Sequence, residues 1–338
     1  MNSVLQGGRQ HRRRRSLLVV LLALLAAPAT VAAALYVALE DEGSGSRPGG
    51  ASAALLGSGA PPGRAPPKLS REPSPLVEEQ PVPDVPLNGV DSFYLRMRRP
   101  PDAALLFDVG SGEVLWRHRP LTRLPVASLT KIMTAIVVTE RARPRARVRI
   151  TRAALRYQGS GVGVLPRGKR VRLETLLNGL LLVSGNDAAI ALAVHVGGTE
   201  RRFVALMNER ARRLGLRCTR FADSHGLSAA NISCARDLAV LTRLAMTNRR
   251  IARIARRRQV SFRFPIKGGR VFFSGHNPLI RAGYRGAVGL KTGYTLRAGR
   301  CFVGVARRGS RTLAVVLLDS PNTLKQSARL LNEGFRNG

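Results

Sequence analysis

Acidic residues are scarce in this chain of 338 residues. It contains 20 Asp plus Glu against 56 Lys plus Arg, which gives a formal net charge of +36. Six of the basic residues are Lys and 50 are Arg. Such a balance usually indicates binding to nucleic acid, although the N-terminus argues against that partner. Apolar residues make up 44% of the chain, enough for a sizeable core, so the chain is not disordered as a whole.

Cysteine is also rare. Three Cys are too few for a small domain held together by disulfides. The sequence has no CxxC pair, which argues against a zinc ribbon. It has no GxxxxGK[ST] motif, which argues against a P-loop NTPase. We therefore expect neither a metal nor a cofactor.

The first 39 residues predict export. Residues 1–16 form a basic tail, and 17–39 are apolar except for Pro28 and Thr30. A run of this length can span a bilayer as an anchor, with its basic flank in the cytoplasm. The alternative is a signal peptide cleaved near 27–29. Both place the rest of the chain outside the cytoplasm, either on the cell membrane or secreted. Export removes nucleic acid as a partner and favours anionic wall polymers or lipid headgroups.

The remainder divides into a linker and one domain. Residues 40–101 are rich in Gly, Ala, Ser and Pro, which predicts a semi-extended tether. From residue 102 to 338 the composition is that of a globular protein, and the length suits a single domain of two or three layers.

Hydrophobic patterning predicts an α/β domain. We expect helices over 129–143, 173–183, 188–196, 203–214, 235–246 and 323–335, and strands over 103–109, 113–118, 287–291, 300–306 and 311–318. Two strands precede the internal helices and three follow them. This order predicts a five-stranded antiparallel sheet covered by helices, with a helical insert.

The first chemical motif is the tetrapeptide Ser128-Leu129-Thr130-Lys131. Spacing of three residues on a helix places Ser128 and Lys131 on the same face. A hydroxyl becomes a good nucleophile when a neighbour takes its proton, and a buried, neutral Lys can do so. The alternative is an N-terminal capping serine followed by an ordinary helical lysine.

Two further motifs supply polar groups. Ser184-Gly185-Asn186 lies between two apolar helices, where Ser184 could relay a proton and Asn186 could hold a substrate carbonyl; plain helix capping is the alternative. The tripeptide 291–293, Lys-Thr-Gly, lies at the end of a predicted strand. Its cation and hydroxyl suit a substrate carboxylate, and the alternative is a strand that ends in a Gly turn with a solvated Lys.

Together the motifs and their flanks resemble the serine D-alanyl-D-alanine carboxypeptidases, the low-molecular-weight penicillin-binding proteins. The resemblance covers about residues 102–335, and its most similar segments are 125–135, 181–189, 221–227 and 289–295. It implies a β-lactamase/transpeptidase-like fold with a helical subdomain. It also implies an enzyme of peptidoglycan biosynthesis that removes the terminal D-alanine from stem peptides and so affects cell shape. Such an enzyme binds penicillin and other β-lactams covalently.

The same resemblance implies a role for each motif residue. Ser128 would be the nucleophile, Lys131 its base, and Ser184 the residue that passes a proton to the departing D-alanine. Substrate would be bound by Asn186, Lys291, Thr292 and Gly293, and the oxyanion hole would be formed by the backbone N–H groups of Ser128 and Tyr294.

Three other functions remain open from the sequence. A serine β-lactamase would need fast deacylation, and the Glu174-x-x-x-Asn178 pattern that could suggest it precedes the second motif, so we interpret Glu174 as a surface residue. A D,D-endopeptidase would use the same residues on cross-linked peptides. A non-catalytic wall-binding protein is the third. We expect the Arg-rich stretches 141–149 and 249–258 to be solvated faces that can also draw the protein to anionic wall polymers.

Cys218 and Cys234 flank the loop 221–227. In an exported protein such a pair predicts a disulfide, which would stabilise the fold by roughly 3 kcal/mol in the chain-entropy model. Cys301 lies on a predicted strand, so we expect a buried free thiol. The alternative is three free buried thiols.

Overall fold

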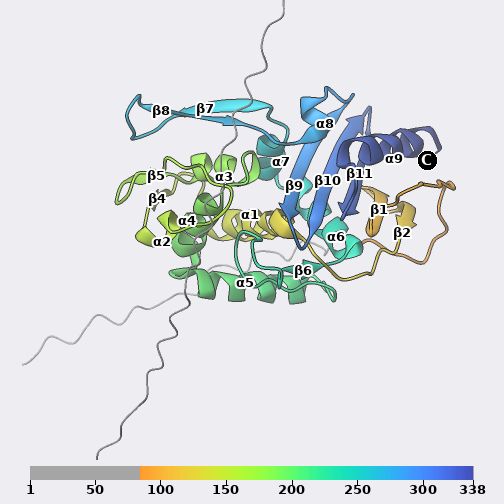
Figure 1. The fold of residues 1–338 in the computed structure, drawn as a ribbon, viewed down its shortest axis with the longest axis horizontal. Helices are drawn as coiled ribbons and strands as arrows, with labels where there is room; N and C mark the ends of the chain where they lie inside the picture. Colours follow the sequence, from red (N-terminus) through yellow and green to blue (C-terminus); the bar gives the residue numbers. More distant parts are fainter. Residues whose placement is uncertain (1–83, 338) are drawn as a thin grey trace, which may run out of the picture. The chain divides into compact units, whose positions relative to one another are not determined.

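The computed structural model describes residues 84–337 (Figure 1). The predicted basic tail and the predicted anchor or signal peptide, residues 1–39, lie outside this range. Within residues 84–337, no helix combines the length and the apolarity that a membrane crossing requires.

A five-stranded antiparallel sheet forms the centre of the domain and confirms the predicted fold. Its strands are β1 (Ala103–Asp108), β2 (Val114–His118), β9 (Ala287–Thr295), β10 (Gly299–Arg308) and β11 (Arg311–Leu318). They lie in the order β2-β1-β11-β10-β9. The first and last strands of the sequence therefore meet in the middle of the sheet, where Leu105 pairs with Val316.

Both faces of the central strands are buried. Along β1, Leu105 and Phe107 face one apolar core, whereas Leu106 faces the other. The first core lies under α1 (Thr130–Arg141) and α6 (Ala235–Thr247), and the second lies under α8 (Pro278–Arg281) and α9 (Thr323–Asn337). Because both faces are covered, these strands are continuously apolar rather than alternating with polar residues.

The predicted helical insert surrounds α1. It contains α2 (Arg152–Leu155), α3 (Leu173–Leu181), α4 (Asn186–Gly197), α5 (Glu200–Arg213) and α7 (Arg249–Ala255). Residues 130–138 of α1 are all buried, and α1 contacts helices α3 to α7 as well as the turn before it. A helix enclosed in this way is apolar around most of its circumference, so Lys131 in its first turn is exceptional.

Several short elements were not predicted. They include the short helices α2, α7 and α8 and the 3₁₀ helix η1 (Ala127–Leu129). The unpredicted strands are the pair β3 (Leu124–Pro125) and β6 (Ile232–Ser233), and two hairpins, β4 (Arg147–Arg149) with β5 (Arg170–Arg172) and β7 (Gln259–Arg263) with β8 (Arg270–Ser274). These strands have two to five residues and many of them carry arginine, so they lack the apolar run that identifies a strand in sequence.

The predicted linker, residues 40–101, does not extend to residue 101 as a tether. Its last part, 84–101, lies against the domain: Val85 is fully buried, and Asp91 forms an ion pair of 2.9 Å with Arg117. Three apolar side chains of this part pack against the second core, namely Phe93, Leu95 and Met97. They alternate with polar residues as in an edge segment, a pattern that the overall Pro-rich composition concealed.

The structure joins Cys218 and Cys234 in a disulfide, and Cys301 is a buried free thiol. The bond ties the segment that follows α5 to the start of α6. Asp237 in the first turn of α6 accepts hydrogen bonds from the Cys218 N–H and the Thr219 hydroxyl, both at 2.8 Å. The loop 221–227 therefore starts from a fixed base, which matters for the site below.

Candidate active site

Ser128 lies on η1, one turn before α1, between β9 and the loop 221–227. Its neighbour Ala127 has a φ of 47°, in the left-handed region that costs free energy for a residue with a Cβ. Two glycines allow the close packing here. A Cβ on Gly226 would collide with the carbonyl oxygen of Ala127, and one on Gly293 would lie 3.1 Å from the backbone nitrogen of Ser128.

The amine of Lys131 lies among three oxygens. Its Nζ is 2.9 Å from Ser128 Oγ, 2.7 Å from Asn186 Oδ1 and 2.5 Å from the carbonyl oxygen of His225. A neutral amine has two N–H donors and one lone pair. Donation to Asn186 and His225 leaves the lone pair for the hydroxyl proton of Ser128, which is the arrangement that a general base requires.

Burial makes that neutral form accessible. Lys131 is fully buried, and desolvation holds its pKa well below the usual value for lysine. The positive charge of Lys291 lowers the pKa of Lys131 further, whereas Asp223 and Asp187 oppose the shift. No carboxylate among residues 84–337 forms an ion pair with Lys131, so the arrangement favours a base over a cation.

The second and third motifs meet beside the first. Ser184 forms the turn between α3 and α4 with a φ of 60°, and its Oγ accepts a hydrogen bond of 2.9 Å from Lys291 Nζ. Asn186 begins α4, and its Nδ2 donates to the carbonyl oxygen of Gln158 at 2.5 Å. That bond assigns the amide orientation, which leaves Oδ1 to face Lys131.

Strand β9 carries the third motif in its interior, not at its end, because it continues to Thr295. It is an edge strand of the sheet, and it contacts η1. The buried Lys291 has its pKa lowered to about 7 by desolvation. Tyr294, by contrast, is 61% exposed. An edge strand with a glycine at this point can accept an extended peptide alongside it.

The loop 221–227 contributes a group that the sequence did not reveal, the carbonyl oxygen of His225. Asp223 fixes this loop by accepting hydrogen bonds from the backbone N–H groups of His225 at 2.9 Å, Ser228 at 2.8 Å and Gly226. A second anchor joins the loop to α1, where Thr134 Oγ1 donates to the Ser224 carbonyl at 2.6 Å. An Asp followed by Gly three residues later is a turn signal, but it does not indicate where the turn points.

Asp187 and Glu174 have structural contacts near the site. Asp187 accepts hydrogen bonds from the N–H groups of Val162 and Gly163 at 2.8 and 2.9 Å, which fixes the loop before α3. Glu174 lies in the first turn of α3 and forms an ion pair of 3.2 Å with Arg250. Neither carboxylate forms a hydrogen bond to Ser128 in this structure.

One group of potential metal ligands occurs among the described residues, formed by Cys218, Cys234 and Asp237. Its two sulfurs are bonded to each other, and a disulfide does not provide the thiolates that a metal site uses. The group is therefore part of the fold rather than a metal centre.

The pH dependence of kcat/KM is expected to be bell-shaped. Below the lowered pKa of Lys131 its amine is protonated and cannot accept a proton from Ser128, so activity is lost as pH falls. Above about 7, the pKa of Lys291, that side chain loses the charge that attracts a substrate carboxylate, so kcat/KM declines as pH rises. A bound substrate carboxylate stabilises the protonated form of Lys291. The decline of kcat at alkaline pH should therefore occur at higher pH than the decline of kcat/KM. Rates of D-alanine release between pH 4 and 10 test this, and a kcat/KM that keeps rising from pH 7 to 10 contradicts it.

The chain resembles known proteins over most of this domain. The family profile of the D-alanyl-D-alanine carboxypeptidases, peptidase family S11, matches residues 99–322. The carboxypeptidase DacB2 of Mycobacterium tuberculosis is 35% identical over 245 residues, 70% of this chain and 82% of the relative. DacC of Escherichia coli is 35% identical over 69% of this chain. The chain spans 61% of that longer protein.

Solved structures agree with the sequence relatives. A crystal structure of a D-alanyl-D-alanine carboxypeptidase from Mycobacterium tuberculosis superposes with a TM-score of 0.68 at 32% identity. The match covers 74% of this chain and 97% of that one. The three motifs, their geometry and these matches lead to one conclusion: the chain belongs to the D-alanyl-D-alanine carboxypeptidase family.

Proposed function

We propose that this protein is a serine D-alanyl-D-alanine carboxypeptidase that removes the terminal D-alanine from peptidoglycan stem peptides through an acyl-enzyme on Ser128. The observation that carries the proposal is the position of Lys131 Nζ, 2.9 Å from Ser128 Oγ in a fully buried site. Family membership supplies the substrate class, and β-lactams are expected to acylate the same oxygen.

In the acylation step, Lys131 takes the proton of Ser128 Oγ while that oxygen attacks the carbonyl carbon between the two D-alanines. The negative charge that develops on the carbonyl oxygen is stabilised by the backbone N–H groups of Ser128 and Tyr294. The C–N bond then breaks, and the departing amine takes a proton from Ser184 Oγ. Ser184 is re-protonated by the proton that Lys131 took from Ser128, which leaves Lys131 neutral. Lys291 keeps its charge and orients Ser184 Oγ through a hydrogen bond of 2.9 Å.

Substrate is held at both ends of the reacting bond. Lys291 and Thr292 bind the terminal carboxylate, as a cation and a hydroxyl can. Gly293 leaves room for the substrate backbone, since a Cβ there would crowd the nitrogen of Ser128. Asn186 binds the preceding part of the peptide and also orients Lys131.

Deacylation reverses the roles with water. Lys131, neutral again, takes a proton from a water molecule whose oxygen attacks the ester carbonyl, and Ser128 Oγ departs with a proton. The balance is one water consumed, one D-alanine and one shortened peptide released. A β-lactamase uses a carboxylate to activate the deacylating water. Here Asp187 is bound by the N–H groups of Val162 and Gly163 and Glu174 by Arg250, so penicillin esters should persist.

Product analysis tests the proposal. Full-length protein is incubated with a pentapeptide ending in D-Ala-D-Ala, with a cross-linked muropeptide dimer and with penicillin, and released D-alanine, monomers and opened penicillin are quantified. We expect fast release of D-alanine and a long-lived penicillin adduct. Preferential cleavage of the dimer would identify an endopeptidase, and rapid penicillin turnover would identify a β-lactamase; either result contradicts the proposal.

We also propose an extracytoplasmic location, on the cell membrane through residues 17–39 or secreted if these are cleaved. The apolar run with its basic flank supports this, as does the disulfide between Cys218 and Cys234, because such bonds persist in oxidising compartments. Fractionation of cells followed by N-terminal sequencing of the mature protein distinguishes an anchor from a cleaved signal.

A further inference from the structure

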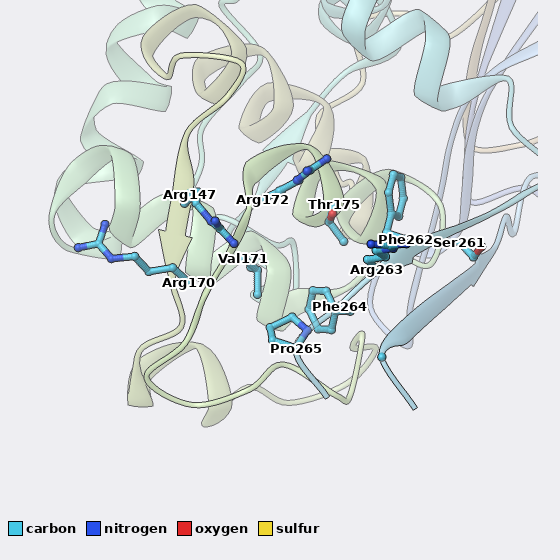
Figure 2. A pocket seen from close by; sticks show the side chains of 11 residues that line it. Arg147, Arg170, Val171, Arg172, Thr175, Ser261, Phe262, Arg263, Phe264 and Pro265 are labelled. Atoms are coloured by element: carbon cyan, nitrogen blue, oxygen red, sulfur yellow. The ribbon is translucent and has the colours of Figure 1, made fainter. Parts of the chain in front are cut away.

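A groove lined with arginine runs across the helical subdomain, apart from Ser128 and its partners. It consists of three cavities of about 450, 390 and 410 Å³ that follow one another. The first and second share Arg147 and Arg172, and the second and third share Arg145. We call these three adjoining cavities the arginine groove. Figure 2 shows its first cavity, between the hairpins β4–β5 and β7–β8.

Both hairpins place arginines directly opposite one another. In β4–β5, Arg147 pairs with Arg172 and Arg149 pairs with Arg170. The strands read Arg-Val-Arg, and because side chains alternate across a strand, the two valines are buried while all four arginines are exposed. In β7–β8 the outermost pair is again two arginines, Arg263 and Arg270. Like charges facing each other across a sheet destabilise it.

The protein does not neutralise these charges itself. Among residues 84–337, none of the six paired arginines forms an ion pair with a carboxylate. Glu174 is the one acidic residue that lines the three cavities, and Arg250 already binds it at 3.2 Å. The positive electrostatic potential of these arginines extends to the third cavity. There the pKa of His195 is lowered, mainly by burial and to a smaller extent by the charge of Arg170. An anion from outside would relieve the repulsion within both hairpins.

The shape of the groove indicates what kind of anion fits. Three cavities in a row can bind a linear polymer along their length. The flat surface of a bilayer would not reach the floor of these cavities. The floor of the first cavity is apolar, with Val171, Phe264 and Pro265 side by side (Figure 2). It can take the carbon segments of a chain between its charges. Arginine forks donate two parallel hydrogen bonds to the oxygens of a phosphate group.

We propose that the arginine groove binds a linear phosphodiester polymer of the cell envelope, of the polyol-phosphate type. Its phosphates would lie beside the opposed Arg147 and Arg172 and the neighbouring Arg170, and its carbon units on the apolar floor. The bound polymer would hold the enzyme at the wall by a surface separate from its active site. The inference rests on the charge pairing and the groove, and it does not require the carboxypeptidase activity.

The test measures binding of the full-length protein to immobilised poly(glycerol phosphate) over a range of NaCl concentrations. A hairpin variant replaces with Gln four arginines in β4–β5 and just before it that line the cavities: Arg145, Arg147, Arg170 and Arg172. We expect its affinity to fall tenfold or more near physiological salt, and the slope of log K against log[NaCl] to decrease by about 3, because each phosphate contact adds about 0.7 to that slope. Dextran, a neutral polymer, should not bind.

A matched control carries the same loss of four charges on another surface. It replaces four exposed arginines of α5 and the turn after it with Gln: Arg201, Arg202, Arg212 and Arg217. It should bind the polymer like wild type apart from a small effect of net charge. Both variants should be labelled by fluorescent penicillin at the wild-type rate, which shows that they are folded.

Three results would overturn the proposal. One is an equal loss of affinity in the control, which would mean that net charge alone governs binding. Another is a hairpin variant that binds the polymer as wild type does. The third is a loss confined to phosphatidylglycerol vesicles or single-stranded DNA, with polymer binding unchanged, which would assign the groove to a membrane surface or a nucleic acid.

Discussion

Replacement of Ser128 by alanine is expected to abolish covalent labelling by fluorescent penicillin and to lower the kcat of D-alanine release by about 10⁶-fold, the size of the loss when a serine peptidase loses its nucleophile. The physical reason is that no other oxygen takes its place. Within residues 84–337, Ser128 carries the one serine hydroxyl bonded to Lys131 Nζ, whereas Ser184 Oγ is bonded to Lys291.

The variant should keep its fold, since only one oxygen is removed from a half-buried position. Thermal unfolding of wild type and Ser128→Ala measures this directly. A matched control is Ser111→Ala, which removes an exposed hydroxyl from the turn between β1 and β2. Labelling of Ser128→Ala at the rate of this control would show that another residue is the nucleophile.

The second large effect is expected for Lys131→Arg. Arginine keeps the positive charge but does not lose its proton in proteins, so it cannot act as the base for Ser128. We expect the acylation rate to fall by about 10³- to 10⁴-fold, the upper part of the range for general-base catalysis. The measurement is single-turnover labelling with fluorescent penicillin.

Two further variants separate loss of the base from loss of the fold. Lys131→Met fills the buried position with a neutral side chain and should acylate as slowly as Lys131→Arg, although the Asn186 and His225 oxygens lose a donor. Lys169→Arg makes the same chemical change at an exposed lysine and should leave the rate unchanged. Wild-type acylation by either Lys131 variant would assign the base to another group.

The sequence predicted the chemistry wherever the contact is local. Ser128 on η1 and Lys131 in the first turn of α1 are three residues apart, and this short spacing brings their side chains together. The central strands were also readable, because burial on both faces makes them continuously apolar, as in β1 and β11. The motif at residue 291 was placed at a strand end, because Gly293 interrupts the strand pattern and glycine is uncommon inside strands, although β9 continues to Thr295.

The structure of segments that depend on contacts with residues distant in sequence could not be predicted from the sequence. The part of the predicted linker from 84 to 101 packs on the domain because Val85 and the alternating Phe93, Leu95 and Met97 find apolar surface there. Strand β4 lies within the stretch 141–149, which we interpreted as a solvated face, and its partner β5 was not predicted, for the same reason. Their valines are buried only once β4 and β5 pair, and pairing across 20 or more residues leaves no local periodicity.

The sequence by itself predicted which residues we propose for the reaction and in what order they occur, because residue type and short spacing indicate a nucleophile, a base and a cation. Only the tertiary structure decided how they work together. The fold brings Lys291 to Ser184 across 107 positions and the His225 carbonyl to Lys131 across 94. It also buries both lysines and so lowers the pKa of each. Desolvation is a property of the closed core, and no stretch of sequence contains it.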